Sequence, residues 1–97
     1  MHVLQIEHSI RDFDTWKGAF DRFSDFRQQS GVRRHRVSRP TDDPNYIMID
    51  LEFDSPSEAE SFLAALRRNV WSSREAAPAL MGEPRTRIVE AVEVKEY

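Results

Sequence analysis

The stretch that decides the fold is HSIRDFDTWKGAFD, residues 8–21. Its first two residues are the end of a run from His2 to Ser9. In that run two kinds of side chain alternate, as they do on a β-strand with two different faces. From Phe13 onward the apolar residues recur at helical spacing and form a single stripe. The stretch therefore predicts a strand, a junction and a helix that ends near Gly31, because glycine readily takes the left-handed conformation that stops helices.

The segment that follows predicts a β-hairpin. Residues 32–39 return to extended character, and the apolar run Tyr46–Phe53 suits a further strand. Between them, PTDDPN at 40–45 supplies Pro44 and Asn45, which preset or tolerate the backbone angles of turns.

A second helix is predicted to begin within DSPSEAE at 54–60. Asp54 or Ser55 can accept the free N–H groups of a first helical turn, and Pro56 has no N–H that needs a partner. Apolar residues continue at helical spacing as far as Val70, which is where we expect the helix to end.

Residues 71–84 predict irregular structure. Three residues that interrupt helices and strands fall within this segment: Pro78, Gly82 and Pro84. Only one short helical turn is expected, over residues 72–77. Alternation resumes at 86–94 and predicts a final strand.

The order strand, helix, strand, strand, helix, strand predicts an α+β fold of the ferredoxin-like βαββαβ type. With right-handed crossovers, it gives a four-stranded antiparallel sheet with both helices on one face. We expect residues 1–97 to form a single domain, since smaller pieces would not bury a core of their own.

The alternation also assigns the two faces of the sheet. Leu4, Ile6 and His8 share one side of the first strand, and we expect this side to face the helices. The opposite face is polar with balanced charge: Gln5, Glu7, Arg34, Arg36, Met48, Asp50 and Glu52. Two interpretations are open: the polar face is covered by water, or it pairs with the same face of a second copy.

Composition narrows the classes of function. The formal charge of −3 offers no general attraction to nucleic acid or to anionic membranes, and the basic run RRHR at 33–36 alternates between faces on a strand. The absence of cysteine excludes disulfides and thiolate chemistry. The N-terminal residues show neither a signal peptide nor a membrane span, so we expect a cytoplasmic protein.

Three residues near the first junction carry groups that bind metals: His8, Asp12 and Asp14. Asp12, however, immediately precedes the helix and can cap it, and Asp14 in the first turn suits the positive end of the helix dipole. Capping explains both aspartates, so no metal is expected. We also expect no bound cofactor.

A site for a small molecule is the sharper hypothesis. His8 and His35 are candidate acid–base residues, because histidine exchanges protons near neutral pH. Trp16, Phe20 and Trp71 are candidate residues of an apolar pocket. The alternative is that the histidines are hydrogen-bonded core residues and that the aromatic residues fill the core.

Two motifs then carry a resemblance to a known family. HxxxDFDxWKxxFD spans residues 8–21 and DDPN spans 42–45; Arg27, Gly31, EFD at 52–54 and GEP at 82–84 accompany them. Together they resemble small bacterial dimeric α/β-barrel proteins related to the antibiotic-biosynthesis-monooxygenase superfamily and often labelled "cyclase". This chain departs from that group between Arg67 and Met81.

The resemblance implies a homodimer whose two sheets form a barrel, with a pocket between the sheet and the helices of each subunit. It favours a protein that binds a small aromatic or polyketide-like compound, with cofactor-free monooxygenase or cyclase-like activity as the implied chemistry. The alternative function is a structural or regulatory dimer without catalysis, in which every core is filled.

Overall fold

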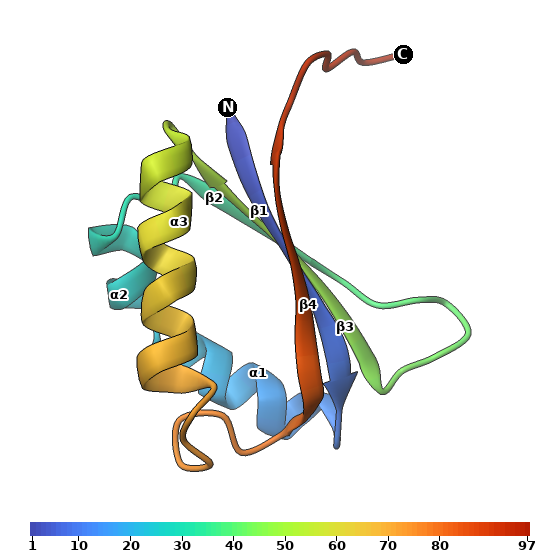
Figure 1. Ribbon diagram of the computed structural model, residues 1–97. Helices are drawn as coiled ribbons and strands as arrows, with labels where there is room; N and C mark the ends of the chain where they lie inside the picture. Colours follow the sequence, from blue (N-terminus) through green and yellow to red (C-terminus); the bar gives the residue numbers. More distant parts are fainter.

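A four-stranded antiparallel sheet forms one layer of the molecule, and the helices form the other (Figure 1). The computed structural model describes residues 1–97. The strands are β1 (His2–Ile10), β2 (Arg34–Ser38), β3 (Tyr46–Phe53) and β4 (Leu80–Glu90), in the sheet order β2-β3-β1-β4. The helical elements are α1 (Phe13–Arg22), α2 (Ser24–Gln29), α3 (Pro56–Ala65) and the π-helical turn η1 (Leu66–Val70). None of these helices has the length and apolar character needed to cross a membrane.

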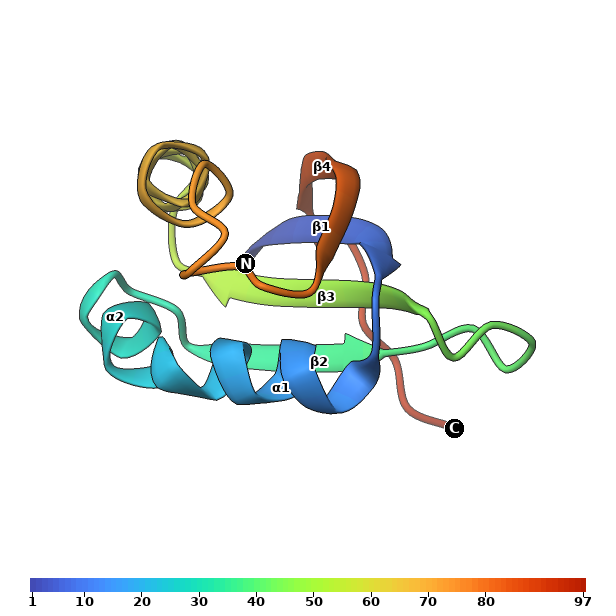
Figure 2. The ribbon, with the colours of Figure 1, turned by 90° about the horizontal axis from the view of Figure 1, so that it is seen from below.

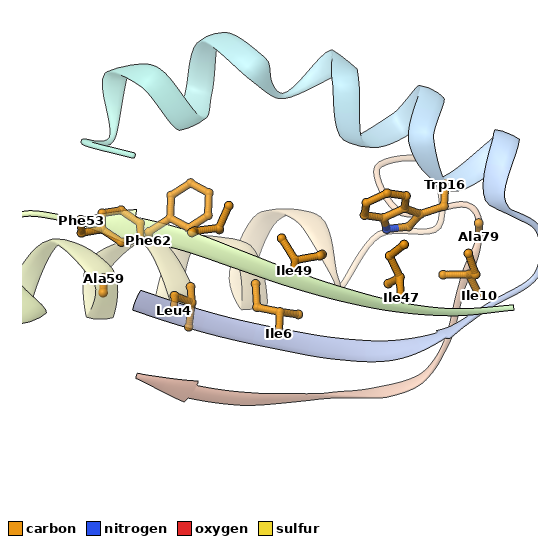
Figure 3. Packing of buried hydrophobic residues seen from close by; sticks show 11 residues of the cluster. Leu4, Ile6, Ile10, Trp16, Ile47, Ile49, Phe53, Ala59, Phe62 and Ala79 are labelled. Carbon is orange, nitrogen blue, oxygen red and sulfur yellow. The ribbon is translucent and has the colours of Figure 1, made fainter. Parts of the chain in front are cut away.

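The core lies between the sheet and the helices, as the alternation predicted. Leu4 and Ile6 of β1 are buried, and so is every second residue of β3 from Ile47 to Phe53. Figure 2 shows the helices along one side of the sheet, and Figure 3 shows Trp16 reaching from α1 toward Ile47. The ferredoxin-like α+β arrangement is therefore confirmed.

Capping residues begin the helices at the predicted places. The Asp12 carboxylate accepts a hydrogen bond from the backbone N–H of Thr15 at 2.8 Å, and the Ser55 hydroxyl accepts one from the N–H of Glu58 at 3.2 Å. Gly31 has a φ of +98° just after α2, the conformation expected where a helix stops. The strand-to-helix junction at Asp12 is thus held by a cap.

The first helix is broken, whereas the sequence predicted one continuous helix. The break falls at Phe23, whose backbone leaves helical geometry between α1 and α2. The carbonyl of Phe20 accepts hydrogen bonds from the N–H of Phe23 at 3.2 Å and from Nη1 of Arg27 at 2.7 Å. A side-chain bond from Arg27 in α2 therefore stabilises the end of α1, and the spacing of apolar residues does not reveal such a bond.

The predictions for residues 71–84 and 86–94 are partly wrong. Strand β4 begins at Leu80 and runs through Gly82 and Pro84. Residues 72–77 hold a single turn, closed by a hydrogen bond of 2.9 Å from the N–H of Ala77 to the carbonyl of Ser73, and no helix longer than that. The strand tolerates both interrupting residues because it lies at the sheet edge and bulges there: Glu7 pairs with Arg85, but Ser9 pairs with Met81.

The same strand ends at Glu90, earlier than predicted. Its neighbour β1 starts at His2, and one further backbone hydrogen bond joins the N–H of Ala91 to the carbonyl of Met1 at 3.0 Å. Beyond this point there is no strand left to pair with, and the last residues leave the sheet (Figure 1).

The face of the sheet opposite the helices carries residues in cross-strand rows. One row runs Arg36, Asp50, Gln5 and Arg87 from β2 to β4. The next row includes the ion pair between Nε of Arg34 and Oε2 of Glu52, which are 2.7 Å apart. We call this surface the outer face, and its register matches the assignment made from alternation.

Candidate functional site

A cavity lies between the sheet and the helices. The volume open to the centre of a water molecule is about 70 Å³. This volume is several times the roughly 10–15 Å³ that a cavity needs to hold one water molecule. Its wall is almost entirely apolar. The lining residues are Ile6, His8, Trp16, Ala19, Phe20, Phe23, Arg27, Ile49, Leu51, Phe62, Leu66, Val70, Trp71, Ala76, Ala77, Pro78, Ala79 and Leu80.

Aromatic rings form the helix side of the cavity. The rings of Trp16 and Phe20 are stacked with their centroids 4.8 Å apart, and both residues project from the same stripe of α1. Trp71 completes the wall from the residue that follows η1. The structure thus brings together the three predicted pocket residues, and a flat apolar ring is the ligand that such walls suit.

The segment that the sequence left irregular closes the cavity. In η1, the N–H of Trp71 bonds to the carbonyl of Leu66 at 2.8 Å, a wider spacing than in an α-helix. This places Leu66, Val70 and Trp71 on the cavity wall, and residues 76–80 cross over to β4 as the next part of it. Sequence spacing indicated helix up to Val70 but not the π-helical turn.

His8 is the buried histidine of the cavity wall, with 4% of its surface exposed. Its Nδ1 lies 2.9 Å from the backbone carbonyl of Ser9. Because a carbonyl can only accept, Nδ1 carries the proton, and Nε2 keeps a free lone pair with no protein partner. Burial lowers the pKa of His8, so the ring is neutral at pH 7 and its Nε2 carries no proton.

The β4 bulge lies directly opposite His8. Glu7 and Ser9 on either side of His8 have partners on β4, but the extra residues of the bulge leave His8 without one. Bulges often occur beside functional sites because they free and redirect a side chain.

Arg27 is the second polar side chain of the wall, and no site role was predicted for it. It is buried, with 6% of its surface exposed, and its guanidinium carbon lies 3.7 Å from the centroid of the Phe20 ring. A signal was present in the sequence: Phe20, Phe23 and Arg27 follow helical spacing, which places a cation within an apolar stripe. Burial lowers the pKa of Arg27 but leaves it charged.

His35 lies outside the cavity, although the sequence suggested that it faces the same space as His8. It is exposed on β2, the edge strand, and its ring stands at 80° to the Phe20 ring with the centroids 5.2 Å apart. The strand that carries it lies two places away from β1 in the sheet. The two predicted acid–base residues are therefore not brought together.

Metal ligation finds no support in the positions of the acidic residues. Asp12 caps α1, and Asp14 is exposed in its first turn. No group of three or more potential metal ligands is brought together.

No protein-family model and no curated protein sequence matches this chain. Several solved structures do share its fold. SnoaB, described as a cofactor-independent oxygenase from Streptomyces nogalater, has a TM-score of 0.70 at 14% identity over 96% of this chain and 94% of that one. An antibiotic biosynthesis monooxygenase has a TM-score of 0.69 at 12% identity, over 96% and 100%. A dimeric ferredoxin-like protein from an uncultured marine organism has a TM-score of 0.62 at 10% identity, over 100% of both chains.

Identities this low establish a common fold, and the roles of individual residues rest on the geometry of this chain. The likeness agrees with the resemblance carried by the 8–21 and 42–45 motifs. The chain has the ferredoxin-like α+β fold of the antibiotic-biosynthesis-monooxygenase-like structures.

Proposed function

We propose that this protein is a homodimer in which each subunit binds a small aromatic compound between its sheet and its helices. The observation that carries the proposal is the cavity lined by Trp16, Phe20 and Trp71. Apolar walls with few polar groups are typical of small-molecule sites. The alternative, a dimer with filled cores, expects solid packing around Trp16, and the open space beside that ring counts against it.

His8 is the proposed acid–base residue of the site. Its free Nε2 lone pair can take a proton from an acidic hydroxyl or C–H group of the ligand, while the Ser9 carbonyl holds the ring by Nδ1. Proton removal activates an aromatic compound for the reaction class that the SnoaB description names, cofactor-independent oxygenation. The exposed His35 has no part in this proposal.

Intrinsic fluorescence tests ligand binding directly, because both tryptophans of the chain line the cavity. Titration with small aromatic compounds, including phenols, naphthols and quinones, is expected to change the emission saturably. Filling the cavity by Ala76→Leu is expected to weaken the response at least about tenfold, since the added atoms take the ligand's space.

The matched control is Ala64→Leu, which adds the same atoms at an exposed position of α3. It is expected to bind as the wild type does. If the emission of the wild type stays unchanged across the panel, or if both variants bind equally well, the cavity is not a ligand site. Oxygen uptake with each compound that binds then tests the oxygenation step, and His8→Gln is expected to abolish it.

A further inference from the structure

We infer that the ligand of this cavity is an anion: an aromatic ring with an acidic oxygen that binds the buried guanidinium of Arg27. The inference deepens the proposed function and rests on it. It starts from the composition of the wall, in which the two polar side chains, Arg27 and His8, are both basic and no carboxylate is present. A wall of this kind is electrostatically suited to negative charge.

Most hydrogen-bond donors of Arg27 have no protein acceptor. Nη1 donates to the carbonyl of Phe20 at 2.7 Å, which uses one of the five N–H groups of the guanidinium. Nε and Nη2 form no hydrogen bond within the chain, and neither is sealed off from open space. Since the residue is 94% buried and lines the cavity, these donors are available to a molecule inside it.

The charge of Arg27 is also unpaired. No carboxylate lies within 4.0 Å of its guanidinium. Asp21 is the acidic residue that acts on it through space, but the Asp21 carboxylate is bound to Nζ of Lys17 at 2.7 and 2.8 Å. A buried cation without a counter-ion is costly, and a ligand anion would remove that cost.

Part of the role of Arg27 is structural. Its bond to the Phe20 carbonyl places a cation at the C-terminal end of α1, where the helix dipole favours positive charge. Stacking on the Phe20 ring holds the guanidinium plane in place. Both contacts orient the side chain and leave its other donors free, as expected of a preorganised anion site.

The apolar walls and the cation together define the ligand class. The Trp16 and Phe20 rings favour a flat aromatic body, and a guanidinium favours carboxylate or phenolate oxygens. Carboxylate and phenolate oxygens both carry negative charge and accept hydrogen bonds from a guanidinium, so both fit the inferred site. His8 lines the same cavity, and its free Nε2 is a proton acceptor for a phenol.

The test uses pairs of probes that differ in the acidic oxygen. Binding of para-nitrophenol is compared with that of para-nitroanisole, and binding of benzoate with that of benzyl alcohol, by tryptophan fluorescence. The acid of each pair is expected to bind at least about tenfold more tightly, as a charge-assisted hydrogen bond would give. In addition, bound nitrophenol is expected to show the yellow phenolate absorption at a pH below its own pKa. If only benzoate binds more tightly than its neutral partner, the ligand is a carboxylate. If only nitrophenol does so, the ligand is a phenolate.

Arg27→Met removes the charge and keeps the volume of the side chain against Phe20. It is expected to abolish the phenolate absorption and the preference for the acids, so that the acid and the neutral probe of each pair bind equally well. Arg27→Lys keeps the charge and is expected to retain most of the preference. Circular dichroism and thermal melting establish that each variant is folded.

The outcomes separate this inference from the proposed function. If neutral and acidic probes bind equally well to the wild type, or if Arg27→Met keeps the preference for acids, the anion site is wrong and the aromatic cavity stands. If no probe of either kind binds, the proposed function fails and the inference fails with it.

Discussion

At the residue scale, the burial of His8 determines its charge and therefore its effect on stability. The pKa of His8 lies below its ordinary value of 6.5 because the buried ring resists protonation. As the pH falls below about 6.5, the unfolded chain takes up a proton that the folded chain refuses. The free energy of unfolding should therefore decrease from pH 7 toward pH 5.

Replacing His8 by leucine removes this linked protonation, so the melting temperature of His8→Leu should depend less on pH in that range than that of the wild type. His35→Gln is the matched comparison. The pKa of His35 is also lowered by desolvation, but the residue is exposed and should contribute a smaller part of the slope. Equal slopes for His8→Leu and the wild type would show that His8 is not protected from protonation.

The two polar residues of the cavity differ in how far the sequence could predict them. The position of His8 followed from alternation along β1, because each second side chain of a strand shares a face. Arg27 could be seen as a cation within an apolar stripe, but its role depends on the Phe20 carbonyl and on the break at Phe23. The hydrogen bond and the break depend on how α1 and α2 pack, and the spacing of apolar residues along the sequence does not predict this packing.

At the scale of elements, Gly82 allows β4 to pass through its bulge. Its φ of +72° lies in the left-handed region, where a side chain is strained even though open space surrounds the position. Gly82→Ala should therefore lower the free energy of unfolding by about 1 kcal/mol.

Gly18 gives the opposite expectation for the same substitution. It lies inside α1 with no atom within 4 Å of an added Cβ, so alanine should raise the free energy of unfolding by about 0.5–1 kcal/mol. Denaturant unfolding of the two variants measures both values. If the two substitutions changed the free energy of unfolding equally, the backbone conformation in the bulge would not be the reason for glycine at position 82.

The elements show which sequence signals were sufficient. Tyr46–Phe53 was predicted with its observed bounds, because a largely apolar run between turn residues has the length and pattern of a strand. For β4, Gly82 and Pro84 suggested a loop because each interrupts a regular strand. An edge strand with a bulge accepts both, and whether a strand lies at an edge is decided by the whole sheet.

On the scale of the whole molecule, the outer face has charges that the single chain does not pair. Arg36 lies beside Asp50 in one cross-strand row, and Arg87 stands in the same row beyond Gln5. None of these three charged residues forms an ion pair within the chain. Two copies meeting through this face could pair them across the interface. The outer face could be predicted from the sequence of one chain. How two such faces align could not, because the alignment depends on contacts between copies.

The proposed homodimer therefore predicts that the protein sediments at twice the mass of the chain. Asp50→Arg places three like charges in one row of the outer face and should shift the protein toward the monomer, because repulsion is then repeated in both copies. Glu60→Arg makes the same change of charge at an exposed position of α3, on the other side of the sheet, and should leave the dimer intact. A wild-type protein that sediments as a monomer, or an Asp50→Arg variant as dimeric as Glu60→Arg, would contradict pairing through the outer face.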